Sequence, residues 1–296
     1  MKQISLGRHR LKVPPIVLGC AGITELDGFR IFGKADEKEV VSTIHRSLEL
    51  GGNFLDITGP NILPENEKLI GSAIKGKRDQ YILAAKMNGR REHIKNVVER
   101  TLKNLDTDYI DIYYLQQPDT DAFIGETMSS MVKLVREGKI GHVGLIDPSS
   151  STIQRAQKIH PVAAVQLEYS LFNRSAEQSG MLEIIKNLGI GLIARSPLGK
   201  GFLTGDIRIN SMDGFPVVRD GDYERKMALA YEINKMADEK DISAAQLAIA
   251  WTIAKGSLPV VCTRRIKHLE EDTAAAGIQL NSSDMSRLET VVPWRN

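Results

Sequence analysis

The sequence predicts an α/β protein built as one closed (β/α)8 barrel, the TIM-barrel architecture, preceded by a short β-hairpin. Two observations predict the barrel: eight short apolar runs recur along the 296 residues, and segments with helical spacing separate them. The runs are too apolar for strands with one exposed face, which favours a parallel sheet covered by helices. Because eight strands close such a barrel in about 250 residues, we expect a single domain over residues 1–296.

The eight predicted strands are bounded by polar or turn-forming residues. They are Ile16–Leu18, Asn53–Asp56, Tyr81–Ala85, Tyr109–Leu115, His142–Leu145, Ala164–Leu167, Gly191–Ala194 and Leu258–Cys262. Between them, segments such as 40–48 and 94–105 carry apolar residues every three or four positions, which is typical of helices with one buried face. The alternation of strand and helix continues to the end of the chain.

Local signals mark where several of these helices begin and end. Asp36 and Glu39 resemble a capping box at a helix start. Gly51, Gly138 and Gly189 follow helical segments at the positions where a left-handed residue ends a helix. These signals place the helices between the predicted strands.

Two further segments do not belong to the repeating units. Residues 2–13, with Gly7 at the centre, predict a hairpin suited to plugging the bottom of the barrel. Residues 203–222 form a long loop, either a lid or a solvated connection. An open doubly wound sheet is the alternative fold, but no G-x-G-x-x-G sequence follows the first strand.

Composition excludes several classes of function. The net charge of +2 and the scattered basic residues give no face for nucleic acid. No apolar run approaches the roughly 18 residues of a membrane span, and no signal peptide is visible. Two cysteines cannot form a disulfide framework, so we expect a cytoplasmic protein. The oligomeric state is not readable from these features.

Polar residues follow almost every predicted strand, at the end of a parallel barrel where chemistry takes place. They are Cys20, Asp56, Lys86, Gln116 with Gln117, Asp147, Gln166, Arg195 with Ser196, and Thr263. Asp56 and Lys86 each come directly after an apolar run, so burial and pairing of the two charges are expected. The convergence of these groups predicts a site for a small molecule.

Neither histidines nor cysteines suggest a metal or nucleophile site. None of the six histidines joins the polar ring, and no metal-ligand spacing appears, so we predict no metal. Cys20 and Cys262 end the first and last strands, which are neighbours in a closed barrel. They can approach one another, but the simplest expectation is two buried thiols that pack as small apolar groups.

Several ordered motifs resemble those of the aldo-keto reductase superfamily in its bacterial form. They are GGNFLDITGPNILPENEKLIG, YIDIYYLQQPD, LVREGKIGHVGL, QLEYSLFNR, ARSPLGKGFLTG and CTRRIKHLEEDTAAAGIQL, and together they span nearly the whole chain. The resemblance implies a (β/α)8 barrel, NADP(H) as cofactor and a small-molecule substrate. It also implies a catalytic group of aspartate, tyrosine, lysine and histidine.

This sequence keeps only half of that group. The aspartate falls on Asp56 and the lysine on Lys86, whereas the tyrosine falls on Asn61 and the histidine on Gln116. The family's tyrosine protonates the oxyanion that hydride transfer creates, and a carboxamide has no transferable proton near neutral pH. Losing a positioned general acid costs about 10²- to 10⁴-fold in rate. The degenerate tetrad therefore predicts altered chemistry.

The resemblance also assigns the cofactor residues, and here the sequence matches the family only in part. Matching positions are Gln166 for the nicotinamide carboxamide, Ser196, Leu198, Gly199 and Lys200 for the pyrophosphate, and the segment of Thr263, Arg264, Arg265, His268 and Glu271, whose arginines suit the 2′-phosphate. Ile146 and Asp147 replace a serine–asparagine pair, Arg195 replaces the aromatic residue under the nicotinamide, and Asp272 replaces the asparagine at the adenine. The phosphate end is kept and the nicotinamide end is altered.

Three functions remain open. The first is a repurposed enzyme in which Lys86 transfers a proton in a modified redox reaction, an elimination or an isomerisation. The second is an inactive NADP(H)-binding or interaction protein, expected if Arg195 and Asp147 pair across the nicotinamide pocket. The third is an ordinary carbonyl reductase with a relocated acid, for which Tyr113, Tyr114 and Tyr169 are the candidates.

Overall fold

Eight parallel strands close into the predicted barrel. The structure is a computed structural model that describes residues 1–9, 11–21, 23, 36–57, 64–88, 94–116, 124–204 and 223–292. The strands are β3 (Val17–Gly19), β4 (Phe54–Asp56), β5 (Ile82–Asn88), β6 (Ile110–Gln116), β7 (Ile140–Ile146), β8 (Val162–Glu168), β9 (Gly191–Arg195) and β10 (Leu258–Cys262). Their order around the barrel is β10-β3-β4-β5-β6-β7-β8-β9, so the predicted fold class is confirmed.

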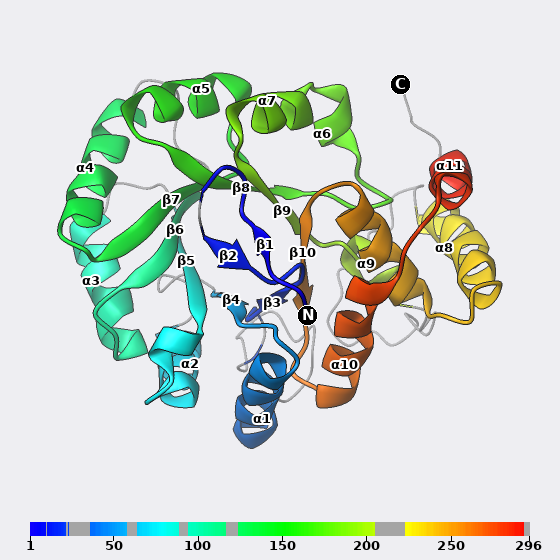
Figure 1. Cartoon of the computed structure of the whole chain (residues 1–296), viewed down its shortest axis with the longest axis horizontal. Helices are drawn as coiled ribbons and strands as arrows, with labels where there is room; N and C mark the ends of the chain where they lie inside the picture. The colour runs from blue at the N-terminus through cyan, green and yellow to red at the C-terminus, as the bar shows by residue number, and fades with distance from the viewer. Residues whose placement is uncertain are drawn as a thin grey trace.

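Helices surround the barrel as an outer ring (Figure 1). They are α1 (Glu37–Glu49), α2 (Pro64–Ile74), α3 (Ile94–Leu105), α4 (Ile124–Arg136), α5 (Ser150–Ile159), α6 (Ser175–Gln178), α7 (Met181–Leu188), α8 (Tyr223–Asp238), α9 (Ala244–Ala254), α10 (Ile266–Ala274) and α11 (Ser282–Val291), with 3-10 turns η2 (Arg78–Gln80), η3 (Gly199–Gly201) and η4 (Ala275–Gly277). Most of the predicted loop over 203–222 lies outside the described residues.

The predicted helix ends are largely correct. Gly51, Gly138 and Gly189 have φ values of 81°, 73° and 68°, as left-handed C-terminal residues require. The Asp36 side chain caps α1 by accepting from the amide of Lys38. The predicted capping box is wrong, because the Asp36 side chain accepts from Lys38 and not from the amide of Glu39, and Glu39 makes no bond to the Asp36 backbone. Asp36 satisfies one of the open amides of the first turn.

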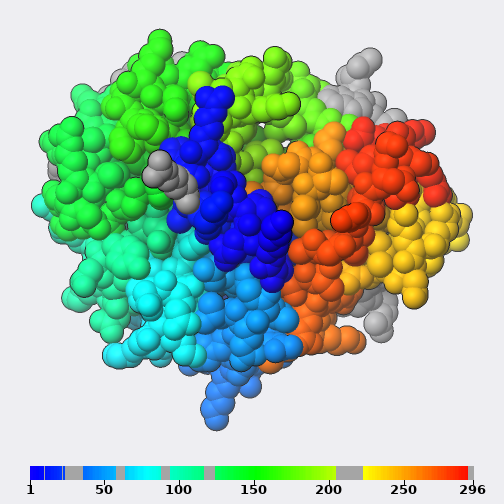
Figure 2. Space-filling model, viewed as in Figure 1, coloured from blue at the N-terminus to red at the C-terminus, as the bar shows by residue number. Residues whose placement is uncertain are grey.

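The hairpin of β1 (Ile4–Ser5) and β2 (Lys12–Val13) lies across the end of the barrel at which the strands begin (Figure 1). Leu6 and Val13 are fully buried in the cluster that fills the barrel interior. A Cβ on Gly7 would collide with the carbonyl oxygen of Gly189, so the turn needs glycine there. In the space-filling view the hairpin covers the centre of this face (Figure 2). The predicted plug is confirmed, and a ligand must enter from the opposite end.

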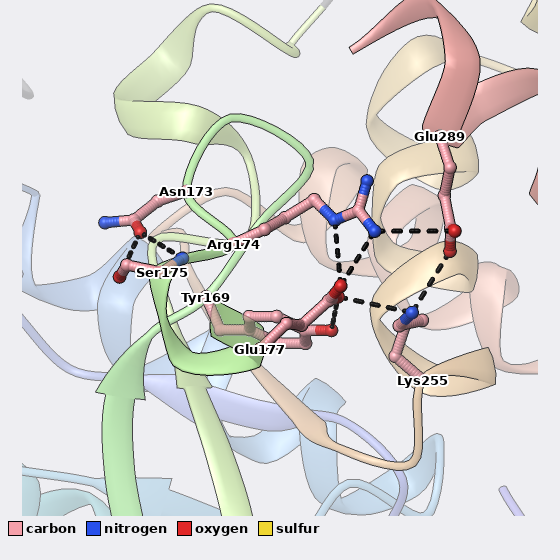
Figure 3. Close-up of polar contacts among 7 residues, drawn as sticks. All are labelled: Tyr169, Asn173, Arg174, Ser175, Glu177, Lys255 and Glu289. Carbon is pink, nitrogen blue, oxygen red and sulfur yellow. Dashed lines mark hydrogen bonds and ion pairs between the residues drawn. The ribbon is translucent and has the colours of Figure 1, made fainter. Parts of the chain in front are cut away.

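A partly buried ion network fixes the chain where β8 ends. The Glu177 carboxylate accepts from the Tyr169 hydroxyl at 2.5 Å and from Arg174 at 2.7 Å. Lys255 bridges Glu177 and Glu289 at 3.2 and 3.1 Å (Figure 3). Burial alone would raise the pKa of Glu177, but the bonds from Arg174 and Tyr169 outweigh it and the pKa is lowered. The loop after β8 is thereby tied to α9 and α11.

The described residues contain neither a membrane-spanning helix nor a metal-binding cluster. Within these ranges, no helix is both long and apolar enough to cross a membrane. In the same part of the chain, no group of three or more His, Cys, Asp or Glu side chains is arranged to hold a metal ion.

Three histidines gather at the plugged end of the barrel. His9 Nε2 donates to the Val162 carbonyl oxygen at 3.1 Å, and the His9 ring meets the His142 ring edge-on with 5.7 Å between the ring centroids. Burial lowers the pKa of His142, the proximity of His9 lowers it further, and Asp111 opposes this effect. The pKa of His160 is also lowered, first by burial and then by His9. Protonation here is therefore less favourable than in the unfolded chain.

The histidine cluster predicts that acid weakens the fold. Because the folded pKa values of His142 and His160 lie below the ordinary value of about 6.5, the unfolded chain binds more protons below that pH, and the free energy of unfolding falls as the pH drops. Between pH 8 and 5, the free energy of unfolding measured in urea should decline less steeply for His142→Gln than for wild type. Lys158→Gln, a change at an exposed residue of α5, should leave the decline unchanged, and equal slopes for all three would refute the assignment.

Candidate functional site

The candidate site is built from residues at the open end of the barrel, opposite the hairpin. Side chains alternate along a strand, so a residue two positions after an interior residue also faces inward. Asp56 follows the interior Phe54, and Gln166 follows the interior Ala164. Lys86 on β5 faces inward by the same alternation. The strand period therefore aims these polar groups into the barrel mouth.

Asp56 binds two of the other groups through one oxygen. Lys86 Nζ donates to Asp56 Oδ2 at 2.8 Å, and Gln166 Nε2 donates to the same atom at 3.2 Å. β4 and β8 are opposite one another in the strand order, so the bond between Asp56 and Gln166 crosses the interior. The side chains of Asp56 and Lys86 are 6% and 16% exposed. The pair is thus nearly buried, with an opening to solvent on the lysine side.

Three buried polar atoms around this pair have no hydrogen-bond partner among the described residues: Asp56 Oδ1, Gln166 Oε1 and the Tyr114 hydroxyl. Tyr114 is fully buried in the interior cluster. Burial raises its pKa well above the ordinary value, and the Asp56 charge raises it further.

A second layer of ion pairs lies closer to solvent. Arg195 Nη2 contacts both carboxylate oxygens of Asp147, at 2.8 and 3.1 Å, and the two side chains are 31% and 33% exposed. Because β7 and β9 flank β8, this ion pair crosses the strand that carries Gln166. Lys200 Nζ lies 3.2 Å from Glu168. The mouth therefore has a buried lower pair and exposed upper pairs.

Sequence reasoning missed Glu168, although a usable signal existed. The alternation of Ala164, Gln166 and Glu168 along β8 places all three on one face. Its partner Lys200 follows β9 in a left-handed conformation, with φ of 58°. Extending the predicted strand by one residue would have included Glu168 in the polar ring.

The two cysteines differ from one another. Cys20 is buried among apolar side chains, as expected. The expectation is wrong for Cys262, which is exposed at the mouth because it continues the inward alternation of β10. A Cβ on Gly19 would collide with Cys262 Sγ, so the thiol lies against the β3 backbone. Desolvation by the surrounding protein and the Asp56 charge raise the pKa of Cys262 to about 11.

Of the two replaced catalytic positions, the structure describes Gln116 but not Asn61. Gln116 ends β6 half-exposed at the mouth, where its carboxamide forms no bond to another described side chain. Asn61 lies outside the described residues, as does Gln117. Among the residues described, no tyrosine hydroxyl or histidine ring is hydrogen-bonded to Lys86. In the part of the chain that the structure describes, the amine is thus hydrogen-bonded to the carboxylate and not to a phenol or an imidazole.

Comparison with known proteins identifies the family. Residues 15–293 match the model of the Aldo/keto reductase family. The chain is 31% identical over 314 aligned positions to "Probable aldo-keto reductase 1" of Glycine max, covering 99% of this chain and 89% of that protein. It also resembles a thermostable aldo-keto reductase crystallised with the inhibitor epalrestat, with a TM-score of 0.82 and 26% identity over 98% of this chain and 100% of that one.

The chain belongs to the aldo/keto reductase family. Its members are oxidoreductases that act on small molecules and typically bind NADP(H). Whether the residues of this chain fit that cofactor depends on the two ends of the expected site, which the structure describes separately.

The residues at the phosphate end suit an anion. α10 starts after Arg265, whose side chain makes no capping bond, so the first amides of the helix remain open. Burial lowers the pKa of Arg264, and the neighbouring Arg265 charge lowers it further. An anion between the two guanidinium groups would relieve this repulsion. Thr263 braces the turn by accepting from the Arg265 amide at 3.2 Å.

The residues expected at the pyrophosphate lie in the turn after β9, and those expected at the adenine lie on α10. Ser196 and Gly199 have positive φ values of 51° and 59° in the turn after β9, and Leu198 packs against the core. On α10, His268 is exposed and Glu271 is half-exposed. Asp272 is buried, and desolvation followed by the Glu271 charge raises its pKa to about 7. The adenine end therefore carries a carboxyl group that is partly protonated at neutral pH.

The residues at the nicotinamide end do not fit the ring in the observed conformation. Gln166 is fully buried, although its Oε1 atom is an unpaired acceptor. Ile146 is buried in the interior cluster and offers no polar group. The ion pair of Arg195 and Asp147 holds a cation where the family has an aromatic platform. Productive stacking would require this pair to rearrange.

Proposed function

We propose that this chain binds NADP(H) and acts on a small carbonyl or hydroxyl compound, with Lys86 as the group that transfers the proton. The observation that supports this proposal is the 2.8 Å pair of Lys86 and Asp56 at the open end of the barrel. Asp56, Lys86, Asn61 and Gln116 are the proposed catalytic positions. The residues given above for the phosphate and nicotinamide ends are the proposed cofactor contacts.

The environment of Lys86 suits proton transfer. Its ammonium group has three N–H donors, and one donates to Asp56. The carboxylate orients the amine through this hydrogen bond. The other N–H groups can meet a substrate oxygen through the opening on the lysine side. Gln116 can donate a second hydrogen bond to that oxygen but cannot deliver a proton.

The same proton transfer serves each reaction class left open by the sequence. In a reduction, NADPH would supply the hydride when bound, and the role of Lys86 would be to give a proton to the carbonyl oxygen. In an isomerisation, a neutral amine would remove a proton next to a carbonyl and the ammonium would return it at another atom of the product. In an elimination, the ammonium would instead give that proton to the departing group. Since the nicotinamide end does not fit the ring as observed, no further step is assigned to the cofactor.

The geometry weighs against Tyr114 as a relocated acid. Its hydroxyl is fully buried, and no hydrogen bond joins it to Lys86 among the described residues. A raised pKa also makes the phenol a weaker acid. Tyr113 belongs to the outer core between strands and helices, and the Tyr169 hydroxyl donates to Glu177. An ordinary reductase with a displaced tyrosine is therefore the least supported function.

One observation favours an inactive NADP(H)-binding protein as the second candidate. The ion pair of Arg195 and Asp147 is formed across β8, where it would exclude the nicotinamide ring. In that case NADPH should bind through Arg264 and Arg265 without a change in nicotinamide fluorescence. Calorimetry would detect the binding, and Arg264→Met should weaken it. A fluorescence change that accompanies binding would reject this candidate in favour of a productive complex.

Removing the amine should abolish turnover. Lys86→Met leaves the buried Asp56 carboxylate unpaired, which typically costs about 3–5 kcal/mol of stability. The double variant Lys86→Met with Asp56→Asn keeps a neutral side chain for Gln166 to contact. Its free energy of unfolding should be close to that of wild type. Both variants should lose about 10²- to 10⁴-fold in kcat, measured with an aldehyde panel by NADPH oxidation and by NMR of the products.

The double variant separates stability from chemistry. A folded double variant that retains wild-type kcat would show that Lys86 does not transfer the proton. The conservative change Lys86→Arg is a second control, because arginine keeps the charge but holds its proton too tightly for transfer.

Restoring the two replaced side chains should restore ordinary carbonyl reduction. Asn61→Tyr with Gln116→His supplies the missing acid and its polar partner beside Lys86. We expect NADPH-dependent aldehyde reduction to rise by about 10²-fold or more over wild type. Adding Lys86→Met should remove the gain. Continued inactivity of a folded double variant would argue against the lost acid as the cause and implicate Arg195.

A further inference from the structure

We infer that the substrate carries a carboxylate in addition to its carbonyl or hydroxyl group, and that Arg195 binds this carboxylate. The inference rests on the proposed function because it names the substrate class of the same site. Its basis is the Arg195–Asp147 ion pair at the mouth, above the pair of Lys86 and Asp56.

The guanidinium of Arg195 is anchored on one side and open on the other. Nη2 alone makes both contacts with Asp147. The Nε and Nη1 donors form no hydrogen bond or ion pair with any described residue, and the side chain is 31% exposed. Nε and Nη1 share no edge of the guanidinium, so a ligand carboxylate would accept a charge-assisted hydrogen bond from one of them. The anchor reduces the side-chain entropy that binding would otherwise cost.

Asp147 is held in place by the backbone. Its amide donates to the Gln166 carbonyl at 3.0 Å, which extends the pairing of β7 with β8. Its φ of 49° lies in the left-handed region, which aspartate and asparagine tolerate better than most residues. Asp147 therefore fixes the guanidinium and, as a carboxylate, also competes with an incoming acid for it.

The charges of the mouth define what kind of ligand suits it. The lower pair of Asp56 and Lys86 is nearly buried, whereas the upper pair of Asp147 and Arg195 is about one-third exposed. Exposed pairs are weak and exchange partners readily, whereas a buried pair does not. A ligand carboxylate can thus exchange with Asp147 at Arg195 while the pair of Asp56 and Lys86 stays formed.

The experiment compares matched acids and esters on the full-length protein. Calorimetry with 2-, 3- and 4-(hydroxymethyl)benzoate and their methyl esters measures binding without reaction, and the three isomers vary the distance between the carboxylate and the hydroxyl. At least one acid should bind about 10- to 100-fold more tightly than its ester, as expected for hydrogen bonds to a charged group. Equal affinity of every acid and its ester would overturn the inference.

Two variants at the upper pair should shift this preference in opposite directions. Arg195→Met should remove the preference for the acid. Asp147→Asn removes the competing carboxylate at a position where asparagine fits the backbone, and should tighten acid binding by about 2- to 5-fold. Lys75→Met removes one positive charge at the exposed end of α2 and should change neither affinity. Weaker acid binding in both mouth variants would indicate a structural role and overturn the inference.

Turnover of the corresponding carboxybenzaldehydes separates this inference from the proposed function. If the variant with Lys86→Met and Asp56→Asn keeps wild-type turnover, the proposed function fails, whereas the acid preference measured by calorimetry stands. If turnover depends on Lys86 but acids and esters bind and react equally in wild type, the proposed function stands and the inference fails.

Discussion

One carboxylate oxygen, Asp56 Oδ2, organises the open end of the barrel. It accepts bonds from Lys86 on β5 and Gln166 on β8. Because Asp56 lies on β4, which is opposite β8 in the closed sheet, the bond from Gln166 links opposite sides of the barrel. A nearly buried carboxylate must be paired because an isolated charge in that environment is very costly. The orientation of the lysine and the depth of the glutamine both follow from this requirement.

The site divides into two layers with different energetics. In the lower layer, desolvation makes the loss of one partner expensive, so the geometry of Lys86 is fixed. In the upper layer, Arg195 and Asp147 are partly solvated, and such pairs contribute about 0–1 kcal/mol. The upper layer can therefore rearrange around a ligand without disturbing the lower one. A fixed amine beneath an adjustable contact is suited to binding and then positioning a small molecule.

Much of this arrangement could be predicted from the sequence because it follows from local periodicity. The apolar runs located all eight strands, although β5 extends to Asn88 rather than Ala85. Alternation along the strands aimed Asp56 and Gln166 into the mouth, and Gly7 marked the turn of the plug. These features depend on residues that are close in sequence, so their spacing carries the information.

Other features depend on contacts between distant residues and could not be predicted in the same way. Whether Arg195 reaches Asp147, 48 positions away, depends on how two loops approach one another at the rim. The place of the Cys262 thiol against β3 depends on the small size of Gly19 on that neighbouring strand. Glu168 was missed because the predicted β8 ended one residue early, which is the usual precision of a strand boundary.

The retained pair of Lys86 and Asp56 supports a chemical role more than a structural one. A buried ion pair contributes little net stability, and well-packed apolar residues of similar size often stabilise a core as well or better. The barrel already has an extensive apolar interior below this layer and an outer core beneath the helices. Because folding does not require a charged amine at the mouth, proton transfer by that amine gives a sufficient physical reason for its presence there, beside a carboxamide that can bind a substrate oxygen but cannot protonate it.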